Sequence, residues 1–265
     1  MLTEAYMQRA LVAALLLAPL CAFLGVFVTA RRMAFFSDTV SHAALAGIAV
    51  GFWLGLSDPT IPMILVGLAV AFAVMWLKQK TDLLTDTIMA LLLSGSVSIG
   101  IIMLSLLKAS HGDIHRFLFG DILAVGPLDL WLAGGLALLV GAGALPRLSD
   151  LTLLTAQEEM ASVSGVAVVR LNYLFVTALT LTVALSIRLL GIVLVTSLLV
   201  VPSAAARNVS RSLRQQIVLS VASGLAGGCG GTLLAYQLDT PCGPTIVLAS
   251  IAIFLTTLGI KHWPS

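Results

Sequence analysis

The sequence predicts an all-α polytopic membrane protein, a single bundle of eight or nine transmembrane helices. Of its 265 residues, 59% are hydrophobic and only 10% are charged, whereas a soluble domain carries about 25% charged residues. Long apolar runs recur along the whole chain, and each is about as long as a lipid bilayer requires. Since no shift in composition marks a boundary, we expect residues 1–265 to form one transmembrane domain.

Nine apolar runs define the expected helices, and they fall near residues 10–30, 40–56, 59–77, 84–107, 128–146, 172–187, 189–206, 216–236 and 244–260. The first run is followed by Arg31 and Arg32, whereas a signal peptide carries its charge before its apolar stretch. We therefore expect this run to remain as a membrane span. Only Arg188 and Gly191 interrupt the stretch 172–206, which predicts either a tight hairpin of two short spans or one bent helix with a re-entrant piece.

Positive charge is distributed unequally over the loops. If nine spans alternate, one side receives Arg31, Arg32, Lys78, Lys80, Arg147, Arg170, Arg207, Arg211, Arg214 and Lys261. The positive-inside rule places this side in the cytoplasm, so the N-terminus is expected outside and the C-terminus inside. The longest cytoplasmic loop then covers about 147–170. The same bias favours the hairpin at 172–206, because without it Arg147 and Arg207 could not share a side.

Several enzyme classes are excluded by missing motifs. The chain has no GxxxxGK loop to hold ATP phosphates, no HExxH and no GxSxG. We therefore expect no ATP hydrolysis by this chain itself, and no recognisable hydrolase.

The segment "RRMAFFSDTVSHAALAG", residues 31–47, contains the clearest candidate site. Asp38 and His42 are four residues apart and share one face of a helix, so a carboxylate and an imidazole could bind one divalent cation. Zinc usually takes four ligands, and a symmetric dimer would supply the other two. The alternative is that Asp38 caps the helix and pairs with His42 or an arginine. A stripe of small residues, Ala43, Gly47 and Gly51, predicts close helix packing beside this pair.

Two loops carry further candidates. In the cytoplasmic loop "RLSDLTLLTAQEEMASVSGVAV", the acids Glu158 and Glu159 precede Ala161 and Gly165, which indicates either a short surface helix that contacts a partner or an ordinary solvated loop. In the external segment "KASHGDIHRFLFGDIL", an incoming metal ion could be bound first by His111, Asp113 and His115. The alternative is that these histidines are simply solvated.

Taken together, four segments resemble the metal-uptake ABC permeases, the membrane subunits that import zinc, manganese or iron(II). The segment 31–47 resembles the second-span motif of that family, and "DIHRFLFGDILAV" resembles its external helix segment. "TSLLVVPSAAARNVSRS" is similar to its late span around Pro202, and "LDTPCGPTIVL" to the stretch before its last span. The resemblance covers nearly the whole chain and is greatest to the zinc-uptake permeases of Gram-negative bacteria.

This resemblance implies a multi-pass permease of the bacterial inner membrane that works as a homodimer surrounded by lipid. Its partners would be cytoplasmic ATP-binding subunits and a periplasmic metal-binding protein, with no nucleic acid. Asp38 and His42 would line the metal path, and the coupling segment Glu158, Glu159, Ala161 and Gly165 would dock the ATPase. The match at this segment is loose, being limited to the acid, Ala161 and Gly165. Zn²⁺ would be the transported substrate, with no permanently bound cofactor.

The cargo and the energy source have alternatives. Residues 43–47 read Ala-Ala-Leu-Ala-Gly, whereas manganese-type members more often resemble His-x-x-Leu-Pro-Gly, and imidazole suits zinc better than manganese. A manganese or iron(II) permease is the nearest alternative. A secondary transporter coupled to an ion gradient would use intramembrane acids, for which Asp82 and Asp86 are the best candidates. A membrane enzyme or scaffold is the remaining alternative.

Overall fold

The computed structural model describes residues 5–56, 58–107 and 125–262, and all regular structure within these ranges is helical. The helices are α1 (Ala5–Ala30), α2 (Phe36–Trp53), α3 (Thr60–Lys80), α4 (Thr85–Leu107), α6 (Pro127–Ala144), α7 (Leu148–Ala156), α8 (Glu158–Val163), α9 (Val168–Leu190), α10 (Ile192–Val209), α11 (Leu213–Leu238) and α12 (Cys242–His262). The predicted all-α bundle is confirmed. Eight described helices have the length and hydropathy to cross a membrane.

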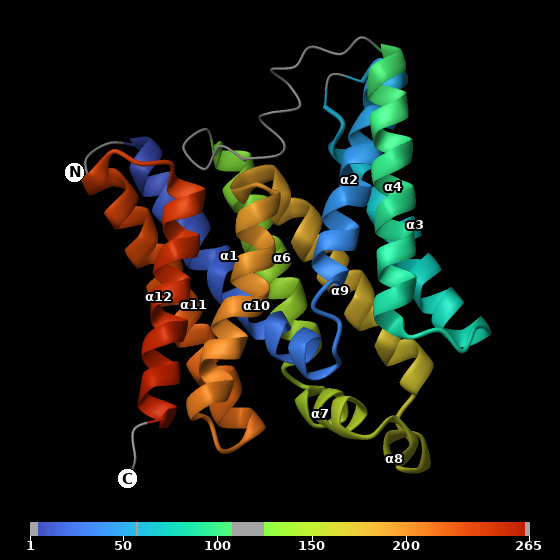
Figure 1. The fold of residues 1–265 in the computed structure, drawn as a ribbon, viewed down its shortest axis with the longest axis vertical. Helices are drawn as coiled ribbons and strands as arrows, with labels where there is room; N and C mark the ends of the chain where they lie inside the picture. The colour runs from blue at the N-terminus through green and yellow to red at the C-terminus, as the bar shows by residue number, and fades with distance from the viewer. Residues whose placement is uncertain (1–4, 57, 108–124, 263–265) are drawn as a thin grey trace.

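Helix α2 is the long helix that falls outside those eight, although it has 18 residues. Its first two turns contain Ser37, Asp38, Thr39, Ser41 and His42, which lower its hydropathy. It nevertheless lies beside α3 and α4 within the bundle (Figure 1). It also begins at Phe36, four residues before the predicted start, because these polar residues are helical although they are not apolar.

The stretch 172–206 forms two helices rather than one bent helix. Helices α9 and α10 have 23 and 18 residues and are separated only by Gly191. Gly191 has a φ of 81°, a conformation that suits glycine. The chain reverses direction there (Figure 1), so the hairpin is confirmed, with helices longer than expected.

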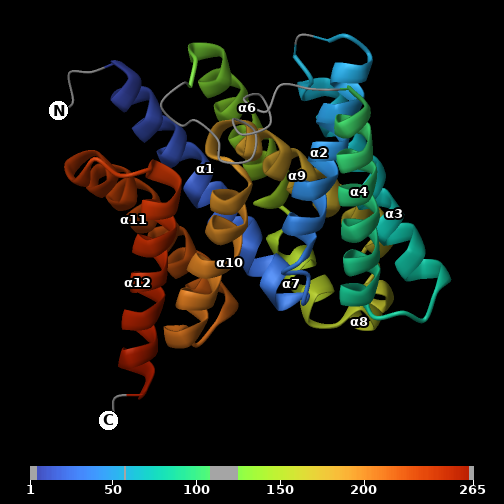
Figure 2. The same ribbon diagram turned by 45° about the horizontal axis from the view of Figure 1, so that its top comes forward.

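The helices pack in two groups, seen from two directions in Figures 1 and 2. One group contains α2, α3 and α4, the other contains α1, α10, α11 and α12, and α9 packs against members of both. Small residues permit close approach between helix backbones. A Cβ atom built on Gly47 would lie 2.6 Å from the Met63 Cα of α3, and one built on Gly51 would lie 2.6 Å from the Pro59 Cβ. The predicted packing role of this stripe is thus confirmed.

The short helices α7 and α8 lie at one end of the bundle, below the end of α1 and the start of α9 (Figure 1). The same end holds the α1–α2 turn with Arg31 and Arg32, and the α3–α4 turn after Lys78 and Lys80. We call it the coupling end, and the end with Asp58 and Arg188 the opposite end. Helix α8 confirms the predicted short surface helix with acids in its first turn. Helix α7 was not predicted.

Candidate metal path and coupling segment

Asp38 and His42 lie in the first two turns of α2, on a face that the chain only partly covers. Asp38, His42 and Leu45 are half-buried, whereas Thr39, Ser41 and Ala43 are buried. The buried flanks contact the neighbouring helices. On α4, for example, the Met89 carbonyl accepts a hydrogen bond from the Thr39 hydroxyl at 3.3 Å. The half-buried face is therefore the face along which a cation or a second protein could meet both side chains.

The imidazole of His42 is oriented by its own helix. Its Nδ1 lies 2.9 Å from the backbone carbonyl oxygen of Asp38. A carbonyl can only accept, so Nδ1 carries the proton and donates. The second ring nitrogen, Nε2, is then the one with a free lone pair, which is the usual arrangement for a histidine that binds metal.

The carboxylate of Asp38 does not cap the helix. Phe35 occupies the N-cap position and makes no side-chain capping bond. Within the described part of the chain, no ion pair joins Asp38 to His42 or to an arginine. Asp38 is therefore not a helix cap, although its carboxylate still interacts electrostatically with nearby His42. No described hydrogen bond or ion pair engages the carboxylate oxygens.

The pair does not form a complete metal site by itself. No group of three or more His, Cys, Asp or Glu side chains is close enough to hold a metal among the described residues. The hydroxyl of Ser41 is buried next to His42 and has no hydrogen-bond partner. In this part of the described chain, Asp38 and His42 are the two candidate ligands, and Ser41 is a buried unpaired hydroxyl that the sequence pattern does not indicate.

The coupling segment is a short helix with a tightly closed end. Glu158 and Glu159 are exposed in the first turn of α8, and Ala161 is fully buried beneath them. Gly165 has a φ of +82°, and its amide donates to the Ser162 carbonyl at 3.2 Å. The next amide, of Val166, donates to the Ala161 carbonyl at 3.1 Å, which completes a Schellman motif that favours glycine at position 165.

A residue that the sequence reasoning used only for topology joins this segment to the start of α2. Arg31 follows α1, and its Nε donates to the Thr155 hydroxyl of α7 at 3.0 Å. Its Nη1 donates to the Asn172 side-chain oxygen of α9, also at 3.0 Å. The Asn172 amide donates in turn to Glu158 at 3.2 Å.

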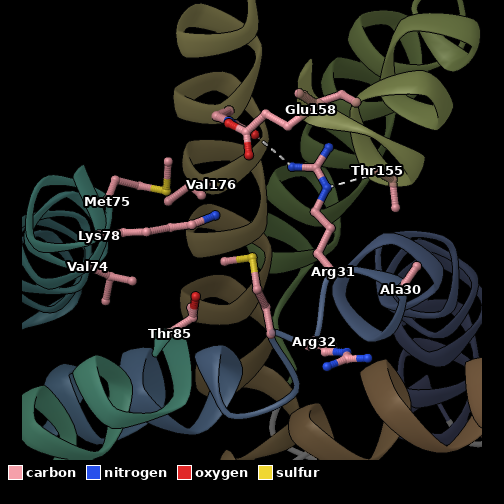
Figure 3. A pocket seen from close by; sticks show the side chains of 13 residues that line it. Ala30, Arg31, Arg32, Val74, Met75, Lys78, Thr85, Thr155, Glu158 and Val176 are labelled. Atoms are coloured by element: carbon pink, nitrogen blue, oxygen red, sulfur yellow. Dashed lines mark hydrogen bonds between the residues drawn. The ribbon is translucent and has the colours of Figure 1, made fainter. Parts of the chain in front are cut away.

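The Arg31 guanidinium is held in an apolar setting. It stacks 4.4 Å from the centre of the Phe175 ring, and its Nη2 is buried without a hydrogen-bond partner. Burial lowers the pKa of Arg31 to about 10, although nearby Glu158 opposes this shift. The side chain therefore stays charged at neutral pH. It lines a cavity of about 250 Å³ into which Lys78 also points (Figure 3).

At the opposite end, Arg188 joins three other elements. It lies near the end of α9, 3.1 Å from an Asp58 carboxylate oxygen in the α2–α3 turn and 3.4 Å from an Asp129 oxygen in α6. It also donates to the Thr60 hydroxyl of α3 at 2.6 Å. The Thr60 hydroxyl and amide and the Arg188 charge hold the pKa of Asp58 below its usual range, against the effect of burial.

The proposed outer contacts His111, Asp113 and His115 lie outside the described residues. Their role therefore stays a prediction from the sequence.

Known proteins resemble this chain over nearly its full length. Residues 3–261 match the profile of the ABC 3 transport family. The chain is 32% identical over 249 residues to the high-affinity zinc uptake system membrane protein ZnuB of Haemophilus influenzae, which covers 94% of this chain and 95% of that protein. It is 29% identical over 254 residues to the manganese transport system membrane protein MntC of Halalkalibacterium halodurans, at 96% and 87% coverage. Among solved structures, PsaBC from Streptococcus pneumoniae in complex with Fab matches with a TM-score of 0.84 and 29% identity, covering 96% of this chain and 91% of that one.

Proposed function

The chain belongs to the ABC 3 transport family, and on that premise we propose that it is the membrane-spanning permease subunit of an ATP-driven zinc importer. It is a multi-pass inner-membrane protein, and its relatives include membrane proteins of zinc and manganese transport systems. The sequence has no phosphate-binding loop. We therefore assign ATP hydrolysis to separate cytoplasmic subunits and metal delivery to a periplasmic binding protein.

The observation that carries this proposal is the free Nε2 of His42 beside the unpaired carboxylate of Asp38. A neutral imidazole and a carboxylate are both good zinc ligands, whereas manganese prefers oxygen ligands alone. The identity to ZnuB of Haemophilus influenzae points to the same cargo. Manganese is the second candidate, because the identity to a manganese transport protein is nearly as high.

We place the complete metal site between two copies of the chain. Among the residues that the structure describes, one copy brings together Asp38 and His42, on a face of α2 that its own helices leave half-covered, and no third metal-binding side chain joins them. In a twofold dimer, two aspartates and two histidines would give zinc its usual four ligands. Without cysteine thiolates, such a site would release the ion more readily when the bundle changes shape.

We assign ATPase docking to α8 and the turn after it. Helix α8 lies at the coupling end, which the positive-inside rule places in the cytoplasm. Its side chains Met160 and Val163 are 55% and 86% exposed, beside Glu158 and Glu159. An apolar centre rimmed by charge is the composition of a protein interface rather than of a solvated loop.

The test is zinc uptake by the permease reconstituted with its ATPase subunits in vesicles. Asp38→Ala and His42→Ala should each abolish ATP-dependent uptake while the complex still assembles, because each removes half of the ligands that one chain supplies. Asp82→Asn with Asp86→Asn is the matched control. Both carboxylates are exposed on the coupling side of α4, and an ion-coupled secondary transporter would depend on them, whereas this importer would not.

Two results would overturn the proposal. Wild-type zinc uptake by His42→Ala would show that the metal path lies elsewhere. Uptake of manganese in preference to zinc by the wild-type complex would replace the proposed cargo with the second candidate.

A further inference from the structure

Arg31 occupies the short connection between α1 and the helix that carries the metal ligands. Its backbone amide donates to the Phe27 carbonyl at 3.0 Å, so Arg31 is fixed to the last turn of α1. Met33 donates to the Val28 carbonyl at 2.9 Å, and the first residue of α2, Phe36, donates to the Met33 carbonyl at 2.9 Å. Successive hydrogen bonds thus attach Arg31 to the start of α2, and Asp38 lies in the first turn of that helix.

The side chain of Arg31 points in the other direction, toward the coupling segment. Its fork of donors contacts Thr155 at the end of α7 and Asn172 near the start of α9. Asn172 also donates to Glu158, the first residue of α8. A displacement of α8 would therefore change the distances at Asn172 first and at Arg31 next.

The chemistry of these contacts argues against a purely structural role. No carboxylate lies within ion-pair distance of Arg31 among the described residues, and one of its nitrogen atoms is buried without a partner. Burying a charge without a direct ion pair is costly, and nearby Glu158 offsets only part of that cost. A neutral side chain of similar length would fill the same space at lower cost. What the guanidinium adds is a planar set of directional donors that contact two helices at once.

We propose that Arg31 is the positioning residue that transmits movement of the α7–α8 segment to α2 and so to the metal ligands. This inference rests on the proposed function, because it assumes that ATPase subunits move α8. Arg31 itself touches neither metal nor nucleotide in this scheme. It sets the position of the helix that carries Asp38 and His42.

The experiment measures metal transported per ATP hydrolysed by the complete complex in vesicles. Loss of one hydrogen bond to a charged group changes an equilibrium constant by about tenfold. We therefore expect Arg31→Met to lower transport per ATP about tenfold. Arg31→Lys, which keeps the charge but loses the fork, should lower it by a smaller factor. A merely structural role would lower the amount of complex, and hence uptake and hydrolysis together, without changing their ratio.

Arg32→Met is the matched control. Arg32 is the next residue, is exposed, and makes no hydrogen bond through its side chain in the described part of the chain. It should keep the wild-type ratio. An equal loss of coupling in Arg32→Met, or an unchanged ratio in Arg31→Met, would overturn the proposal.

Two further variants decide the question if Arg31→Met does not assemble. Thr155→Val and Asn172→Leu each remove one acceptor of the Arg31 guanidinium and leave Arg31 in place. Each should lower transport per ATP, and unchanged ratios in both would overturn the inference. Failure of the proposed function is distinguishable, because it would appear in the wild-type complex as absent zinc uptake. If the wild-type complex carries manganese, the same ratios are measured with manganese.

Discussion

Arg31 and Arg188 each join several helices, at opposite ends of the bundle, but their charges are balanced in different ways. Arg188 is 28% exposed and lies within 3.4 Å of two carboxylates. Arg31 donates to a hydroxyl and an amide oxygen, and no carboxylate lies within ion-pair distance of it in the described ranges. Part of its guanidinium is buried without a partner. Arg188 is neutralised by carboxylates in addition to its hydrogen bonds with Asp58 and Thr60, whereas Arg31 is held by hydrogen bonds to neutral groups.

This difference predicts that the two ends of the bundle respond differently to small movements of the helices. An ion pair between partly exposed groups tolerates small shifts in distance, since its strength falls slowly with separation and water screens it. Directional hydrogen bonds weaken steeply with angle. The carboxylates at the opposite end can therefore keep attracting Arg188 through small movements that weaken its hydrogen bonds, whereas Arg31 has no ion pair of this kind among the described residues.

The largest effect is expected from substitution of Gly165, at the coupling end. If this substitution left coupling intact, the assignment of coupling to this end of the bundle would be wrong. Gly165 has a φ of +82°, which costs other L-residues about 1–2 kcal/mol. Gly165→Trp should therefore open the turn after α8, and its bulk would lie on the surface that we propose as the ATPase docking site. We expect the permease to remain in the membrane and to lose ATPase binding or metal-stimulated hydrolysis, measured by copurification and phosphate release.

Gly165→Asn is the control for that variant, because asparagine adopts left-handed conformations more readily than other residues. It should retain most coupling. Normal copurification and normal hydrolysis in Gly165→Trp would remove α8 from the ATPase interface.

A smaller effect, of a different kind, is expected at the opposite end. Arg188→Met leaves Asp58 and Asp129 without their shared partner. We expect the complex to lose about 1 kcal/mol of stability, because the pairs are partly exposed, and Tm to fall by about 2–4 °C. Transport per ATP should stay at the wild-type value. A loss of coupling like that of Arg31→Met would show that the two arginines do not differ in role.

The pH dependence of stability should separate the two junctions further. The pKa of Asp58 is lowered in the folded protein, chiefly by Thr60. The stabilisation that it contributes is therefore present above the unfolded value of about 4 and is lost as pH falls through the lower folded pKa. Thermal unfolding should show this loss below about pH 4, and Asp58→Asn should reduce it. The loss should persist in Arg31→Met, because the pKa of Arg31, about 10, lies outside this range.

The smallest effect is expected from residues 108–123, which the sequence predicts to be external. The sequence predicts that His111→Ala together with His115→Ala lowers uptake only mildly, since a periplasmic protein captures the metal first. Uptake at limiting zinc is the measurement. A complete loss of uptake would assign part of the metal site to this segment.

Much of the fold could be predicted because membrane spans are defined by length and apolarity. The nine long helices that the structure describes coincide with the nine apolar runs to within a few residues. Two features escaped this reasoning. The start of α2 is polar, and α7 is a nine-residue surface helix without a long apolar run. The hairpin at Gly191 was one of two alternatives, because only the backbone angle at that residue shows the reversal.

The candidate site likewise contains residues that the sequence could predict and residues that it could not. Asp38 and His42 are four residues apart, so the helical period alone placed them on one face. The contacts of Arg31 with Thr155 and Asn172 span 124 and 141 positions of sequence. Those of Arg188 with Asp58 span 130. No local sequence pattern predicts such contacts, because they depend on how helices that are distant in the sequence pack together.

The low hydropathy of α2 has a consequence for biogenesis. An aspartate and a histidine within one span make its partitioning from the translocon into lipid less favourable. The contacts of Gly47 with Met63 and of Gly51 with Pro59 bring α2 directly against the apolar helix α3. We therefore expect α2 and α3 to insert together as a helical pair, so that a bulky residue at Gly47 would lower the amount of permease that reaches the membrane before it affected any step of transport.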